Sequence, residues 1–189
     1  MGKFSALSDA SRTIVNLLKA ELEGIVNPEN IGVCDPRERT NFTVGIHLYD
    51  LQENGEFRET REVVLQDGST KPPPTSLSLY IVISVASKAE LPVRAFDEQR
   101  ILGKVIQTLN DYGRLPEQHM PEALRQAGET ITIELLSVDL EEKIKIWSLF
   151  GQPYKPSCFY RISPVLIESA IVRKPKPKVR GLETQIRRK

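Results

Sequence analysis

The segment from Asp139 to Glu168 constrains the fold most, because it joins a helical pattern, a fixed turn and a long apolar run. Three apolar side chains recur at i, i+4 and i+7, a spacing that places them on one face of a helix: Leu140, Ile144 and Trp147. Asp139 is a suitable N-cap, and Gly151 stands where a helix commonly ends in a left-handed residue. The pattern predicts a short helix that is buried through Trp147, the only tryptophan.

The residues after Gly151 predict a turn and a strand. Pro153 and Pro156 prevent further helix and fix an extended link. The stretches 157–162 and 165–171 are rich in β-branched and aromatic residues, which favours a strand that is bent or broken at Pro164. A helix, a turn and a long strand in this order are expected to close a small α+β domain.

The rest of the chain predicts two more helices and several strands. Apolar stripes of period 3.6 indicate helices over 5–26 and from about Phe96 to Tyr112, with Gly113 as the stop of the second. Strands are predicted over 31–34, 42–49, 61–65, 77–85 and 130–136, and Asp67-Gly68 marks a turn. We expect an α+β fold with a mostly antiparallel or mixed sheet, flanked by helices that lie on one side.

Composition places the chain among soluble proteins of one domain. It has 189 residues, with no apolar run of about 18 and no basic segment followed by an apolar core at its start. We therefore expect no membrane span and no secretory signal. Cys34 and Cys158 show no ligand spacing and are expected to be free thiols in a reducing compartment.

Charge divides the chain into an acidic body and a basic arm. Residues 173–189 hold eight of the 26 Lys and Arg residues and one of the 25 Asp and Glu residues, so the arm carries +7 and the rest −6. We expect one domain over 1–172 and an extended basic C-terminal arm over 173–189. Such arms commonly bind partners, although a solvated arm without a partner has the same composition.

The arm supplies the candidate partner-binding residues. Its first part alternates lysine with proline over 174–178, which favours a stiff spacer, and a mixed segment over 179–186 follows that could add a strand to a neighbour's sheet. The candidate residues are Arg173, Lys174, Lys176, Lys178, Val179, Arg180, Leu182, Ile186, Arg187 and Arg188. Nucleic-acid binding is less favoured, because the arm has no aromatic residue to stack on bases and the body is acidic.

No catalytic pattern is visible in the sequence. His47 and His119 are far apart, and we expect His47 to have a structural or surface role. The glycines are isolated rather than gathered in a phosphate-binding loop, and no nucleophile or zinc motif occurs. Glu141 and Glu142 are explained as first-turn residues that favour the helix dipole. We expect no enzyme activity, no cofactor and no metal.

Four blocks in order carry a resemblance to a known family. They are 41–49 with 53–54; 73–74 with 77–82; 101–109; and 146–157 with 160 and 164–167. Together they resemble the cap, or tail-terminator, proteins of extracellular contractile injection systems of the antifeeding-prophage type, over about residues 4–172. The Leu102-Gly103 helix followed by the Trp147-Ser148 to Pro156-Ser157 run is the more specific part of the resemblance.

The resemblance implies a structural role. Proteins of this family are similar to phage tail terminators: a homohexameric ring on the baseplate-distal end of the tail stops tube growth and locks the last sheath ring. The implied partners are other copies of the chain, the tube protein and the sheath protein, with assembly in the cytoplasm into a phage-tail-like particle that is in some cases released. The alternative is a monomeric adaptor whose basic arm engages an acidic protein or nucleic acid.

Overall fold

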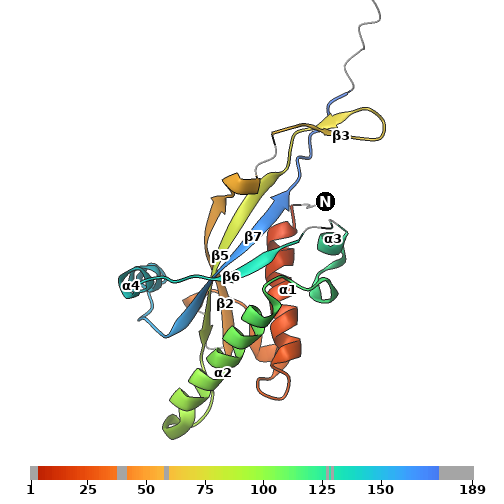
Figure 1. The fold of residues 1–189 in the computed structure, drawn as a ribbon. Helices are drawn as coiled ribbons and strands as arrows, with labels where there is room; N and C mark the ends of the chain where they lie inside the picture. The colour runs from red at the N-terminus through yellow and green to blue at the C-terminus, as the bar shows by residue number, and fades with distance from the viewer. Residues whose placement is uncertain (1–3, 38–41, 58–59, 127, 129, 175–189) are drawn as a thin grey trace, which may run out of the picture.

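The computed structural model describes residues 4–37, 42–57, 60–126, 128 and 130–174 (Figure 1). A twisted sheet of five strands in the order β1-β2-β5-β7-β6 forms its centre. The short β1 pairs with β2 in parallel, and every other pairing in this sheet is antiparallel. The strands are β1 (Ile31–Val33), β2 (Val44–Glu53), β5 (Thr75–Val85), β7 (Ser157–Ile167) and β6 (Thr132–Leu135). The expected α+β class is confirmed.

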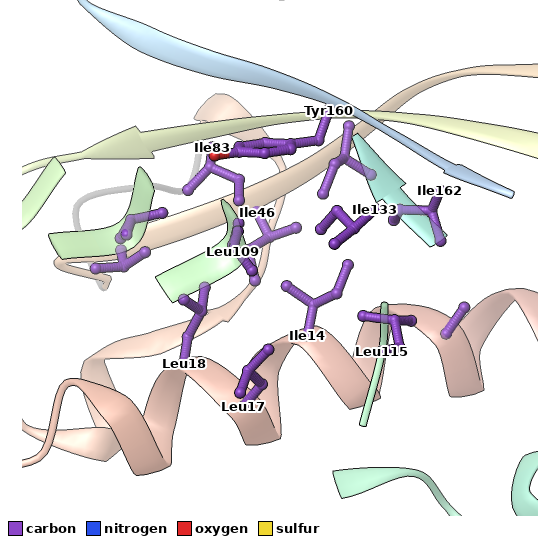
Figure 2. Packing of buried hydrophobic residues seen from close by; sticks show 14 of the residues in the cluster. Ile14, Leu17, Leu18, Ile46, Ile83, Leu109, Leu115, Ile133, Tyr160 and Ile162 are labelled. Carbon is purple, nitrogen blue, oxygen red and sulfur yellow. The ribbon is translucent and has the colours of Figure 1, made fainter. Parts of the chain in front are cut away.

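Most helices cover one face of the sheet. These are α1 (Ala6–Glu21), α2 (Leu91–Tyr112) and α3 (Glu122–Arg125), with a 3-10 turn η4 (Glu117–His119) between the last two. In Figure 2, Ile14, Leu17 and Leu18 of α1 lie on the side of the helix that faces the sheet. The strands meet them with Ile46, Ile83 and Tyr160, all at most 1% exposed. This layer is the main hydrophobic core.

The opposite face of the sheet carries α4 (Leu140–Leu149), so the prediction that the helices lie on one side was wrong. Val82 and Phe159 point away from the main core, because side chains alternate along a strand, and they pack against Ile146 and Trp147. The middle of β5 is consequently buried on both faces, as the side chains of Val82 and Ile83 show.

The predicted stripe on α4 was also wrong. Trp147 is fully buried, but Leu140 is 59% exposed and Ile144 is 45% exposed. The buried side of the helix carries Ile146 beside Trp147 instead. Apolar residues surround this short helix, so their spacing alone does not select the face that turns inward.

Two helix boundaries differ from the prediction over 5–26 and 96–112. The first helix ends at Glu21, and Asn27 instead caps a 3-10 turn, η1 (Pro28–Asn30), by accepting a hydrogen bond from the amide of Glu29 at 3.0 Å. The second begins at Leu91, because Pro92 fits the first turn of a helix, where no amide donor is required. Its end at Gly113, with φ of 55°, is as predicted.

Irregularities shape the long strands. The register between β2 and β5 shifts around Tyr49, so that Leu48 and Leu51 oppose the inward-facing residues Ile81 and Leu79. The β7 strand continues through Pro164, which follows a cis peptide bond, and the register with β5 shifts at this position. It ends at Ile167, four residues before the predicted end.

A small hairpin extends beyond the end of the main sheet (Figure 1). It consists of β3 (Val63–Val64) and β4 (Thr70–Lys71), preceded by η3 (Gly55–Phe57). The predicted turn at Asp67-Gly68 is present: Gly68 has φ of 78°, and an Asp67 carboxylate oxygen accepts the amide hydrogen of Ser69 at 2.9 Å. The hairpin places residues 62–71 at the outer tip of the molecule.

Candidate interaction surfaces

Arg173, the first residue of the expected arm, is bound to the hairpin. Arg173 forms an antiparallel bridge with Thr70: its amide donates to the Thr70 carbonyl at 2.7 Å and its carbonyl accepts from the Thr70 amide at 2.9 Å. Its guanidinium also pairs with Glu62. Lys71 lies 3.6 Å from the carboxylate of Glu168, which ties the hairpin to the chain leaving β7. The hairpin therefore holds the chain at Arg173, one residue before the end of the described part.

Most candidate partner-binding residues lie outside the described part of the chain. Arg173 is held by the hairpin, and Lys174 is exposed at its side. The others fall within residues 175–189, and their role stays a prediction: Lys176, Lys178, Val179, Arg180, Leu182, Ile186, Arg187 and Arg188. The structure thus locates the base of the arm but does not test its contacts.

An apolar groove of about 510 Å³ runs between α1 and the β1–β2 side of the sheet. It is lined by Leu7, Ser8, Ser11, Arg12, Val15, Val33 and Leu48. Val33 is 51% exposed and Leu48 is 40% exposed, so two apolar side chains of the sheet remain open to solvent there. The groove is a place where a partner segment can bury apolar surface.

The outer edge of β2 lies beside this groove. Only its first three residues, Val44 to Ile46, pair with β1, and no other strand of the described chain pairs with the outer side of β2 beyond them. The amide of Leu51 donates instead to a carboxylate oxygen of Asp50, the preceding residue, at 2.8 Å. A side chain thus takes the place of a neighbouring strand, which is a common way to protect a sheet edge.

Two further groups of apolar side chains are exposed. One lies at the start of α2 and comprises Leu91, Val93 and Phe96, which are 78%, 53% and 75% exposed. The other lies on α4 and comprises Leu140, Ile144 and Leu149. Sequence reasoning missed both groups because it assigned apolar residues in helices to the core. The Leu91-Pro92 pair was the available signal, since Pro92 is compatible with an earlier start of α2.

The buried side chain of His47 holds neighbouring parts of the sheet together. His47 is 1% exposed; its Nδ1 lies 2.5 Å from the Cys34 carbonyl and its Nε2 lies 3.0 Å from the Ser84 hydroxyl. Because a carbonyl only accepts, Nδ1 donates to the Cys34 carbonyl, and Nε2 is hydrogen-bonded to the Ser84 hydroxyl. This arrangement ties β2 to β5 and to the chain after β1, which agrees with the structural role expected for His47.

Neither Cys34 nor Cys158 forms a disulfide bond, in agreement with the prediction. Burial raises the pKa of the Cys158 thiol to about 11, which keeps it protonated and unreactive at neutral pH. Within the described ranges, no cluster of three His, Cys, Asp or Glu side chains has the arrangement of a metal site. No helix among these residues is long and apolar enough to cross a bilayer.

Comparison with known proteins identifies a family and a shared fold. A family model described as the Pvc16 N-terminal domain matches residues 9–181. No curated protein matches the chain.

Two solved structures are similar to this one. The first is the PVC sheath/tube terminator of an extracellular contractile injection system in the extended state, with a TM-score of 0.62 and 14% identity over 94% of this chain. The second is the anti-feeding prophage cap, a tube terminating cap, with a TM-score of 0.60 and 14% identity over 90% of this chain. At this identity the likeness shows a common fold. The chain spans 63% and 57% of the lengths of these two proteins.

Proposed function

The chain belongs to the Pvc16 N-terminal domain family, and from this premise we propose that it is a structural cap of a contractile injection system. In this role, copies of the chain form a ring on the baseplate-distal end of the tail, end the growth of the tube and lock the last sheath ring. The observation that carries the proposal is the family match over residues 9–181, supported by the fold shared with a sheath/tube terminator and a tube terminating cap.

The physical mechanism requires surface complementarity rather than catalysis. A tube or sheath grows because each ring offers an open surface to the next. A ring that binds the last open surface and offers none of its own ends polymerisation. The partners are other copies of the chain, the tube protein and the sheath protein, and assembly takes place in the cytoplasm.

The exposed features of the described residues suit such a ring. A closed ring uses a heterologous interface, in which one surface of each copy meets a different surface of the next. The groove beside β2, the start of α2 and the exposed side of α4 are separate apolar surfaces on different elements of the fold. We include the basic arm among the binding elements because its +7 charge opposes the −6 charge of the body.

The test is to mix the purified protein with purified tails that lack it. Light scattering measures the mass of the protein alone, and electron microscopy shows where it binds. Six-fold density at the tail end opposite the baseplate is the expected result. Absence of binding to tails, together with a mobility shift on nucleic acid, would overturn the cap and favour an adaptor that acts through its basic arm.

A further inference from the structure

We propose that the arm of one copy, residues 175–189, binds in the groove of the next copy and adds a strand to the outer edge of β2. This inference rests on the proposed ring, and it specifies one contact that would hold neighbouring copies together. The receiving surface comprises the edge of β2 from Leu48 to Glu53 and the adjoining groove against α1.

The backbone of the receiving edge is suited to strand addition. The pairing of β1 ends at Ile46, so a further segment can lie in line with β1 along the next residues of β2. The Leu51 amide donates to the Asp50 carboxylate. A carbonyl of an incoming strand can take the place of this carboxylate, so that the Leu51 amide stays hydrogen-bonded when it is buried. Strand addition of this kind gains main-chain hydrogen bonds, while side-chain pockets give it specificity.

Side chains of the receiving edge match the arm in polarity. The register shift at Tyr49 places Leu48 and Leu51, 40% and 43% exposed, on the face of the sheet toward α1. In the arm, Leu182, Thr184 and Ile186 alternate with polar residues, the pattern of a strand with one apolar face. The apolar face of the arm can therefore cover the open side of the groove.

The charge of the β2 edge favours the same pairing, although Arg12 in the groove is a cation. Residues 42–57 contain three acids and no Lys or Arg, namely Asp50, Glu53 and Glu56. Residues 175–189 contain six Lys and Arg residues and one acid. An acidic edge repels further copies of itself, which limits unwanted pairing of two β2 edges, and it attracts the basic arm.

The direction of the arm indicates that the groove belongs to another copy. Val165 lies level with Glu53, because both pair with Leu77 of β5. Arg173 follows Val165 by eight residues and lies at the hairpin, about 25 Å farther along at about 3.3 Å per residue. The bridge to Thr70 is antiparallel, so the chain leaves Arg173 pointing away from the body. The Lys-Pro alternation over 174–178 favours an extended spacer that adds about 15 Å.

In the proposed contact, the arm lies in the groove of a neighbouring copy, because the chain at Arg173 runs away from its own body. Each copy therefore gives its arm to one neighbour and receives an arm from the other. That is a heterologous contact, the kind that closes into a ring.

The test is a disulfide between two differently tagged full-length variants. Both carry Cys34→Ser; one carries Leu48→Cys in the groove and the other carries Ile186→Cys in the arm. After mixing and mild oxidation, a non-reducing gel is expected to show a dimer band that contains both tags. The control replaces Leu48→Cys with Gln107→Cys, at an exposed position on α2. The dimer band with Leu48→Cys is expected to be at least tenfold stronger than the band with this control. Weakening of the band in high salt is expected as well.

Two results would overturn the inference. One is a band no stronger than the Gln107→Cys control; the other is a single chain carrying both cysteines that closes on itself and runs as a monomer. The tail-binding assay on the unsubstituted protein separates this contact from the function. Six-fold density without the groove-to-arm disulfide would reject only the contact, whereas absence of any binding to tails would reject the cap itself.

Discussion

The indole Nε1–H of Trp147 donates a hydrogen bond to the hydroxyl of Ser157 across 3.1 Å, which joins α4 to the first residue of β7. The same indole stacks edge-on against Phe150, with ring centroids 6.1 Å apart. Because Trp147 is fully buried and its polar hydrogen is paired, it fixes α4 over the second face of the sheet.

Replacing Trp147 with alanine is expected to lower the free energy of unfolding by about 3–5 kcal/mol, because the change removes a large buried side chain and leaves a cavity. Urea unfolding followed by circular dichroism measures the loss, since the fluorescence of the only tryptophan disappears. The matched control is Leu149→Ala on the same helix, where the side chain is 85% exposed and a change within about 0.5 kcal/mol is expected. Equal effects of the two substitutions would contradict the packing of α4.

Substitution of Gly32 tests the packing of β1, and the same substitution of Gly103 in α2 is its control. A Cβ on Gly32 would lie 2.5 Å from the Phe42 ring, and we expect Gly32→Ala to destabilise the protein by about 1–3 kcal/mol. A Cβ on Gly103, in the middle of α2, would meet no atom within 4 Å, so Gly103→Ala should stabilise by about 0.5–1 kcal/mol. Thermal melting of both variants shows whether the signs are opposite, as the structure requires.

Truncation can separate the arm from the hairpin that holds its base. A chain that ends after Lys174 keeps the bridge between Arg173 and Thr70, and we expect its melting temperature to stay within about 2 °C of the full chain while its attachment to tails weakens. A chain that ends after Val172 also loses this bridge and the pairing with Glu62, so proteolysis within residues 60–71 should become faster. A large loss of melting temperature on removing only 175–189 would show that the arm is part of the fold.

Stability is expected to fall at alkaline pH. Burial raises the pKa of the Cys158 thiol from 9.0 to about 11. Between pH 9 and pH 11 the thiol therefore ionises in the unfolded chain but stays protonated in the folded one. The contribution of this thiol to the free energy of unfolding is complete below pH 9 and is lost as the pH rises toward 11. The loss from this thiol is about 2–3 kcal/mol at most. Urea unfolding from pH 7 to 11 measures it, and Cys158→Ala should reduce the slope.

The elements themselves were largely predictable from local pattern. Alternation over 77–85 and the cap at Asp139 are properties of neighbouring residues, and each produced the strand or helix end that was expected. The stop at Gly113 followed from the left-handed conformation that glycine tolerates. The charge difference between body and arm is likewise a property of the sequence alone.

Only the tertiary structure decided which surfaces are open. Whether Leu48 is covered depends on where β1 stops, and whether Ile144 is buried depends on the rotation of α4 over Val82. The bridge from Arg173 to Thr70 joins positions about a hundred residues apart in the sequence, and a pattern of neighbouring residues does not predict such a contact. Local sequence thus determined the helices, strands and charges, because these depend on neighbours along the chain. The tertiary structure decided the groove, the outer edge of β2 and the position of Arg173 against the hairpin, because these depend on which distant residues meet.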